Sequence, residues 1–211
     1  MTRKISITIG RQCGSGGKEI GVRLADLLGF RVYDSDLLSM AAQKSGMHPE
    51  PLRRVEECAT SSLLYTLAIG SSLHGAQYFG IDMPINDQLF ITQTEIIKDA
   101  AEEESCIFIG RCADFVLRNH PHCINIFVHA DKEKRIERIC RERGLTREAA
   151  SNTVTKTDKR RASYYNFYTG KKWGRSENYH LCVDSTLLGV EGTAQMIAGV
   201  VVRYMDSLAK A

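Results

Sequence analysis

The sequence lacks the cysteine and histidine patterns that mark zinc sites and disulfide frameworks. Its seven cysteines are scattered, with no CxxC pair and no Cys/His cluster at the spacing of zinc ligands. The residues after Met1 contain neither the long apolar run nor the small-residue cleavage site of a secretory signal, and no transmembrane span is predicted. We therefore expect a cytoplasmic protein with reduced thiols and no membrane partner.

The overall composition argues against a disordered chain. Hydrophobic residues make up 43% and charged residues 25% of the 211 positions. This balance is ordinary for a soluble globular protein, whose core offsets the entropy of ordering the chain. The length fits one domain of about 100–200 residues that has been enlarged by insertions. We therefore expect a single domain over residues 1–211.

The net charge of +3 is unevenly distributed along the chain. Residues 132–175 contain 14 of the 28 basic residues and only five acidic ones, so this segment carries +9 and the remainder −6. Such a block fits a nucleic-acid surface, a lid that handles anions, or a solvated helix face. We favour an arginine-rich lid near residues 141–175, because a glycine-rich anion loop lies elsewhere in the chain, and we expect no nucleic-acid partner.

Strand and helix patterns alternate along most of the sequence. Apolar and β-branched runs predict five strands, at residues 4–9, 30–33, 106–109, 123–129 and 181–184. Helical spacing of apolar residues fills the intervals, although residues 60–84 give no firm periodicity. The pattern predicts a three-layer α/β fold with a five-stranded parallel sheet and helices on both faces. Ligands of such folds bind beyond the carboxyl ends of the strands.

A glycine-rich loop, GRQCGSGGK at residues 10–18, follows the first predicted strand and precedes a helix. Glycines permit backbone angles closed to other residues, so successive N–H groups can face one anion at the positive end of the helix. The plain alternative is a tight β-to-α turn. The candidate phosphate-binding residues are Arg11, Gly14, Ser15, Gly16, Gly17 and Lys18.

Several motifs together resemble the cytidylate kinase-like proteins, which are relatives of the P-loop nucleoside monophosphate kinases. The resemblance covers nearly the whole chain. Its motifs are ITIGRQCGSGG at residues 7–17, Tyr33-Asp34, IGRCAD at 109–114, DKRRASYY at 158–165 and VDST at 183–186. The resemblance implies a P-loop kinase that transfers the γ-phosphoryl group of ATP, with Mg²⁺, to a small acceptor such as a nucleoside monophosphate.

The same resemblance implies roles for individual residues. Lys18, Arg160 and Arg161 are the catalytic candidates, and phosphoryl transfer uses such positioned cations. Asp34, Arg111 and Asp114 are the candidates for acceptor binding, on a side that includes an insertion near residues 36–90. Glu19 and Asp34 are the candidate Mg²⁺ ligands, because that cation prefers oxygen donors.

The loop also departs from the usual GxxxxGK[ST] pattern. Counting back five from Gly17 reaches Gln12, and no Ser or Thr follows Lys18. Laid without gaps on a cytidylate kinase, Gly17 occupies the position of the catalytic lysine and Glu19 that of the Mg²⁺-binding Ser or Thr. Two further hypotheses stay open: a non-catalytic nucleotide- or phosphate-binding protein, and a kinase for an unrelated small metabolite. The sequence does not indicate an oligomeric state.

Overall fold

The computed structural model describes residues 3–34, 36–45 and 85–210. A short helix expected near residues 49–58, and the stretch 60–84, lie outside these residues. The described chain forms a five-stranded, all-parallel sheet in the order β2-β3-β1-β4-β5. The strands are β1 (Ser6–Arg11), β2 (Arg31–Tyr33), β3 (Cys106–Ile109), β4 (Cys123–His129) and β5 (Leu181–Asp184). The predicted parallel sheet is therefore confirmed.

Helices occupy the intervals between the strands. They are α1 (Gly17–Leu28), α2 (Asp36–Ser45), α5 (Ile85–Glu103), α6 (Ala113–Val116), α7 (Lys132–Arg143), α8 (Arg147–Thr169) and α9 (Ser185–Lys210). Local chemistry sets several boundaries. The α7 helix begins where the Asp131 side chain accepts hydrogen bonds from two backbone N–H groups of the first turn, and Thr146 caps α8 in a similar way. Gly29 ends α1 in the left-handed conformation, with φ 67°.

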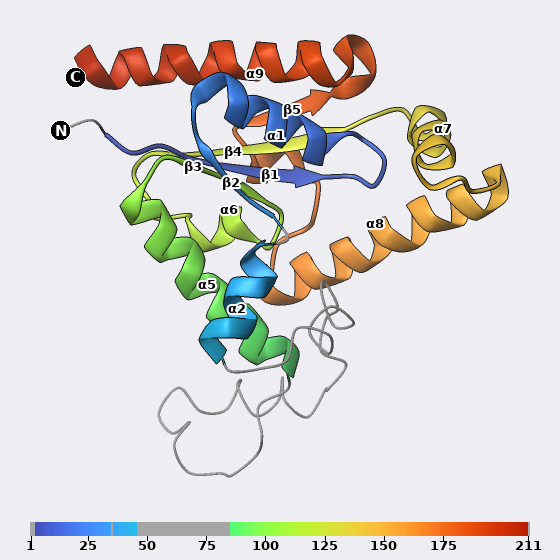
Figure 1. Ribbon diagram of the computed structural model, residues 1–211, viewed down its shortest axis with the longest axis horizontal. Helices are drawn as coiled ribbons and strands as arrows, with labels where there is room; N and C mark the ends of the chain where they lie inside the picture. Colours follow the sequence, from blue (N-terminus) through green and yellow to red (C-terminus); the bar gives the residue numbers. More distant parts are fainter. Residues whose placement is uncertain (1–2, 35, 46–84, 211) are drawn as a thin grey trace, which may run out of the picture.

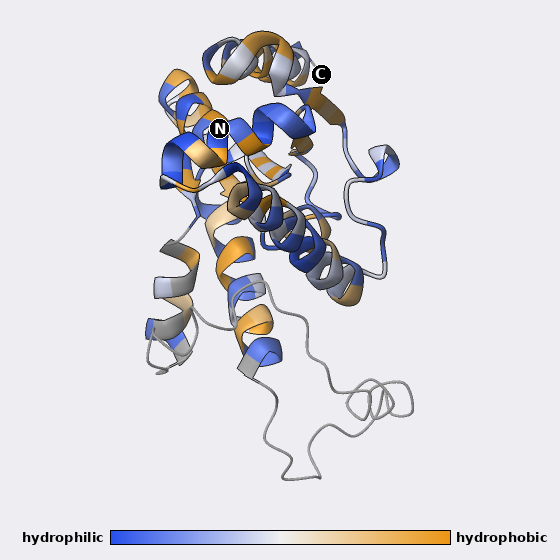
Figure 2. Cartoon of the chain, turned by 90° about the vertical axis from the view of Figure 1, so that its right-hand side faces the viewer, coloured by the Kyte–Doolittle hydropathy of each residue, from blue (hydrophilic) through white to orange (hydrophobic). Residues whose placement is uncertain are grey.

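The helices form layers on both faces of the sheet (Figure 1). On one face α1 and α9 pack over a core that includes Ile7, Ile20, Ile126 and Ile197. On the other face α2, α5 and α6 cover a second core. In Figure 2, hydrophobic residues (orange) alternate with hydrophilic residues (blue) along α5. This three-layer arrangement confirms the predicted fold class.

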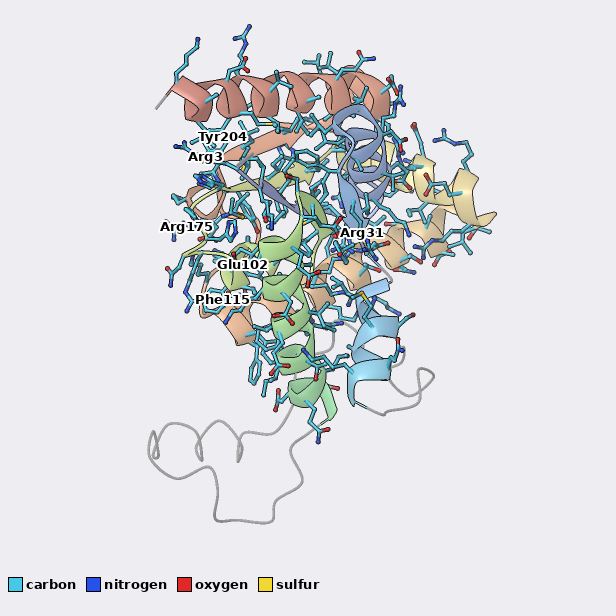
Figure 3. All side chains as sticks on the ribbon, turned by 60° about the vertical axis from the view of Figure 1, so that its left-hand side comes forward. Arg3, Arg31, Glu102, Phe115, Arg175 and Tyr204 are labelled. Atoms are coloured by element: carbon cyan, nitrogen blue, oxygen red, sulfur yellow. The ribbon has the colours of Figure 1, made fainter. Side chains whose placement is uncertain are left out.

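The last helix, α9, is long and apolar enough to cross a membrane when judged by length and composition alone. Its residues Ala194, Ile197 and Val201 are nevertheless fully buried in the core shared with α1 and the sheet. The amino-terminal segment also contacts it, because Arg3 donates a hydrogen bond of 2.6 Å to the carbonyl oxygen of Leu208 (Figure 3). The helix therefore acts as a layer of the domain.

Helices α7 and α8 pair with each other beyond the carboxyl ends of β1 and β4 (Figure 1). A small apolar cluster joins them to the glycine-rich loop. Its buried members are Cys13, Ile136, Ile139, Ala150 and Val154. Because Cys13 belongs to the loop, the helix pair and the loop pack as one unit.

Candidate active site

The glycine-rich loop connects the end of β1 to the first residue of α1. Gly14 and Gly16 both have left-handed backbone angles, with φ 76° and 77°, and Gly16 directly precedes α1. A Cβ atom on Gly14 would lie 2.6 Å from the carbonyl oxygen of Arg135 in α7. Both the backbone angle and the close approach of α7 therefore require glycine at position 14.

An ion pair between α7 and α8 holds the loop at Cys13. The Cys13 N–H group donates to Asp158 Oδ1 at 2.7 Å, while Arg135 Nη1 donates to Asp158 Oδ2 at 2.6 Å and to the Cys13 carbonyl oxygen at 3.3 Å. The Arg135 and Asp158 side chains are only 9% and 18% exposed. We refer to Cys13, Arg135 and Asp158 as the loop clamp. It fixes both backbone polar groups of one loop residue and so restricts how the loop can move.

A second tight turn follows β3, the strand beside β1. Three successive residues, Gly110, Arg111 and Cys112, have φ values of 78°, 58° and 54°. Left-handed angles at two non-glycine residues in succession are uncommon and cost of order 1–3 kcal/mol each. The turn directs Arg111 into the protein, where it is 7% exposed.

The end of β1, the turn after β3 and α8 surround one cavity at the carboxyl edge of the sheet. Its lining combines three arginines with an aromatic wall: Arg11, Arg111, Arg161, Asp114, Tyr164, Tyr165, Trp173 and Tyr179, together with Thr8, Gly10, Gly110 and Cys112. The aromatic wall is braced from β4, because Phe127 contacts Trp173 and Tyr179 with ring centroids 5.3 and 5.0 Å apart. The cavity therefore combines cationic groups with flat apolar surfaces.

The cavity is electrostatically suited to an anion. The pKa of the Arg111 guanidinium is lowered to about 10, chiefly by burial and next by the positive charge of Arg11. Asp34 acts in the opposite direction, and Arg161 adds to the lowering. Clustered, desolvated guanidiniums raise one another's energy, and a bound anion would relieve that repulsion.

A carboxylate lies beside the arginines. The Tyr165 hydroxyl donates a hydrogen bond of 2.6 Å to Asp114 Oδ2. Burial raises the pKa of Asp114, although this hydrogen bond opposes the shift. Burial, followed by the charge of Asp114, raises the pKa of Tyr165 as well, so its hydroxyl stays protonated and remains a donor. The Asp114–Tyr165 pair therefore offers a fixed polar edge to a ligand in the cavity.

The structure brings part of the predicted site together. Arg11, Arg111, Asp114 and Arg161 line the one cavity. Lys18 lies outside that lining, and its Nζ atom is 2.7 Å from Asp34 Oδ2, with the lysine side chain 58% exposed.

The other loop candidates, residues 14–17, lie outside the lining of the cavity, and Ser15, Gly16 and Gly17 are buried. The last two candidates are on the surface. Glu19 is exposed on the first turn of α1, and Arg160 is exposed on α8, next to the half-buried Arg161. Among residues 3–34, 36–45 and 85–210, no three His, Cys, Asp or Glu side chains are grouped as a metal site. The roles assigned to Glu19, Asp34 and Arg160 stay predictions.

Sequence reasoning missed the loop clamp and most of the aromatic wall. Arg135 and Asp158 are 122 and 145 positions away from Cys13, and no local pattern links residues so far apart. A partial signal existed for the wall, because Tyr164 and Tyr165 follow the DKRR run directly. Tyr179 stands alone in a segment of turn residues, and nothing nearby in the sequence marks it.

Comparison with known proteins places these features in a family. Residues 6–187 match the family model described as the cytidylate kinase-like family. No curated protein matches the chain. A solved structure of an uncharacterized protein from Eubacterium ventriosum is 27% identical, with a TM-score of 0.70, and the match covers 97% of this chain and 99% of that one.

Two solved kinases share the fold at lower identity. A gluconokinase from Sinorhizobium meliloti is 16% identical with a TM-score of 0.55, and the match covers 99% of this chain and 98% of that one. A shikimate kinase from Acinetobacter baumannii, in complex with shikimate, is 14% identical with a TM-score of 0.51, and the match covers 96% of both chains. At such identities the likeness concerns the fold alone.

Proposed function

This chain belongs to the cytidylate kinase-like family, and on that premise we propose that it is an ATP-dependent phosphotransferase whose acceptor is a nucleoside monophosphate. The observation that carries the proposal is the cavity in which Arg11, Arg111 and Arg161 converge between the end of β1 and the turn after β3. Transfer of a phosphoryl group depends on positioned cations and in-line geometry more than on covalent chemistry. Three guanidiniums at the junction of a donor loop and an acceptor pocket meet that need.

The chemistry of the cavity favours a phosphate as the acceptor group. In the proposed reaction an acceptor oxygen forms a bond to the γ-phosphorus of ATP, the bond from that phosphorus to the β–γ bridging oxygen breaks, and ADP leaves. A phosphate monoester is largely a dianion at neutral pH, so its oxygen attacks without a general base. The lining supplies three arginines and no histidine among the described residues, and the Asp114 carboxylate already accepts a hydrogen bond from Tyr165.

The aromatic wall supports a nucleoside acceptor. Tyr164, Trp173 and Tyr179 line the same cavity as the arginines. Aromatic faces stack on nucleobases in a way that tolerates different bases. The phosphate of the acceptor would bind Arg111 and Arg161, with its base directed to these rings. We infer no choice among the bases.

Mg²⁺ enters this proposal with ATP, and when bound it would neutralise negative charge on the nucleotide phosphates. Magnesium sites often use only one or two carboxylates with phosphate and water oxygens. Asp34 is a candidate because it is 17% exposed near the loop, although Lys18 shares it. Glu19 on the first turn of α1 is the other candidate.

A non-catalytic nucleotide-binding protein is the second candidate function. The observation that favours it is that Gly17 stands at the lysine position, while Lys18 is paired with Asp34. The third candidate is a kinase for another small metabolite, because the gluconokinase and the shikimate kinase have the same fold. A cytoplasmic location is part of the proposal because ATP is its donor.

One acceptor panel separates these functions. The purified chain is incubated with ATP, Mg²⁺ and one acceptor at a time, namely each nucleoside monophosphate, shikimate or gluconate, and formation of ADP is followed. We expect turnover with at least one nucleoside monophosphate. Turnover with shikimate or gluconate alone would show a metabolite kinase. Binding of ATP without turnover on any acceptor would show a binding protein.

A further inference from the structure

The structure shows which residues of the unusual loop occupy the positions of the standard P-loop pattern. In GxxxxGK[ST] the lysine follows the second glycine and reaches the β- and γ-phosphates. Gly16 fits the second glycine, because it has φ 77° and directly precedes α1. The lysine position is then Gly17, and the first glycine position is Arg11. The loop has a cation where the pattern has glycine, and glycine where the pattern has a cation.

The two exchanged positions touch in space. A Cβ atom on Gly17 would lie 2.5 Å from Cβ and 3.1 Å from Cγ of Arg11. The first distance is shorter than any that real Cβ atoms adopt, so Arg11 already fills the space where a side chain at position 17 would begin. Glycine at position 17 is therefore what allows a side chain at position 11, which here is an arginine.

The backbone of Arg11 is fixed on two sides. Arg11 is the last residue of β1 and is paired in register with Val128 of β4. Its carbonyl oxygen also accepts a hydrogen bond of 3.1 Å from Arg161 Nη1. The side chain thus starts from a rigid strand end, which suits a group that must hold a phosphate in place.

The Arg11 guanidinium extends toward the acceptor side of the cavity. Its Nη1 atom is the nearest neighbour of a Cβ atom built on Gly110, so it lies against the turn after β3. Arg111 and Arg161 line the same cavity. The lysine that follows Gly17 takes another direction, since Lys18 Nζ contacts Asp34 and the side chain is 58% exposed.

We propose that Arg11 takes the place of the P-loop lysine and binds the β- and γ-phosphates of ATP at the point where they meet the acceptor. This proposal rests on the proposed phosphotransferase function. A guanidinium grips two phosphate oxygens at once, unlike the point charge of a lysine, so one residue at this junction can contact both donor and acceptor. Lys18 has no direct role in this arrangement.

A set of four variants tests the exchange. They are Arg11→Ala, Gly17→Lys, the double variant R11G/G17K, and Arg203→Ala as a matched removal of an exposed arginine on α9. We expect Arg11→Ala to lower kcat/KM by about 10²–10³-fold, the usual loss for one preorganised group at a transition state. The double variant R11G/G17K has no Cβ at position 11, so it places the lysine at its standard position without the collision. It should recover at least ~10-fold of that loss, equivalent to about 1.4 kcal/mol.

A further readout, the affinity for ATP, separates this inference from the proposed function. Affinity for ATP without acceptor is measured alongside turnover. If the parent binds ATP but turns over no acceptor, the proposed function fails, whereas loss of ATP affinity in Arg11→Ala would still support Arg11. Parental turnover and ATP affinity in Arg11→Ala, or a folded double variant as inactive as Arg11→Ala, would overturn the inference.

Thermal unfolding tests the close contact between positions 11 and 17. Gly17→Ala is expected to lower the unfolding temperature, and R11G/G17A to restore most of the loss, because residue 11 then has no Cβ for the Cβ of residue 17 to meet. Equal destabilisation of Gly17→Ala in both backgrounds would contradict the close packing of positions 11 and 17.

Discussion

Arg111 occupies a position where both backbone and side chain are energetically unfavourable. Its φ of 58° lies in the left-handed region, and the pKa of its guanidinium is lowered chiefly by burial and next by the positive charge of Arg11. Neither feature helps the chain to fold. Strain and buried charge that persist together are typical of a residue kept for binding.

Replacing Arg111 by methionine tests this interpretation. Arg111→Met removes the charge and keeps a flexible side chain that can fill the same space. We expect unfolding about 2–4 °C higher, corresponding to about 1 kcal/mol in a chain of this size. Inorganic phosphate should stabilise the parent more than the variant. Scanning fluorimetry measures both effects. A less stable variant that keeps the full phosphate response would give Arg111 a structural role.

The buried Asp114 should make the stability of the protein depend on pH. Burial raises its pKa above the ordinary value of 3.8. Its contribution to stability is therefore fully present below pH 3.8 and is lost as the pH rises through the raised value. Asp114→Asn cannot ionise and still offers Tyr165 an oxygen. Urea denaturation at several pH values should show the parent losing stability relative to the variant as the pH rises from 4 toward neutrality. A difference that does not change with pH would contradict this account.

Helix α8 links the two halves of the site. Near its middle, Asp158 holds the loop peptide of Cys13, and one turn later Arg161 reaches the cavity and the Arg11 carbonyl oxygen. Tyr164 and Tyr165 follow on the buried side of the same helix. A displacement of α8 would therefore change the glycine-rich loop and the arginine-lined cavity together. The predicted lid motion of this segment stays a prediction.

The loop clamp should matter to stability far more than a surface ion pair. Asp158→Ala leaves the Arg135 guanidinium without its carboxylate, and we expect a loss on the order of 3 kcal/mol. The control is Glu137→Ala, which breaks an exposed pair with Lys134 on the same helix and should cost less than about 0.5 kcal/mol. Urea denaturation compares the two. Similar losses for both variants would show that the clamp is only a surface contact.

Adjacent arginines on α8 should differ in effect. Residues next to each other on a helix point about 100° apart. Arg161 lines the cavity, and Arg160 is exposed. In steady-state kinetics, Arg161→Ala should lower kcat and kcat/KM together, and Arg160→Ala should cause a smaller loss. If Arg160→Ala lost more activity than Arg161→Ala, α8 would have to bind with its other face toward the ligand.

Prediction from sequence succeeded where the signal was local. The strands Cys106–Ile109, Cys123–His129 and Leu181–Asp184 agree with the predicted limits, because each is an apolar run with clear ends. The four-residue helix α6 is too short to show a period. Strand β1 runs past the expected glycine boundary to Arg11, since pairing with β4 continues to Val128. Contacts such as Cys13 with Asp158 come from the folded topology and have no local signal.

At the scale of the whole molecule, the structure shows where the basic segment of the chain lies. The segment with a net charge of +9, residues 132–175, forms α7, α8 and the loop after them, at the carboxyl edge of the sheet where the cavity opens. Positive potential at a binding cleft attracts anionic ligands and is screened by salt. We expect affinity for ATP to fall as sodium chloride is raised. An affinity independent of salt would argue against this role of the basic segment.

The central claim is that the arginine cavity joins a phosphate donor to a phosphate acceptor. The most direct test is ³¹P NMR of the parent protein with ATP, Mg²⁺ and a nucleoside monophosphate. We expect the signals of ATP and the acceptor to decline together while two nucleoside diphosphates appear, and Arg161→Ala to slow this exchange. Unchanged spectra with every monophosphate, or release of inorganic phosphate without phosphorylation of the acceptor, would contradict it.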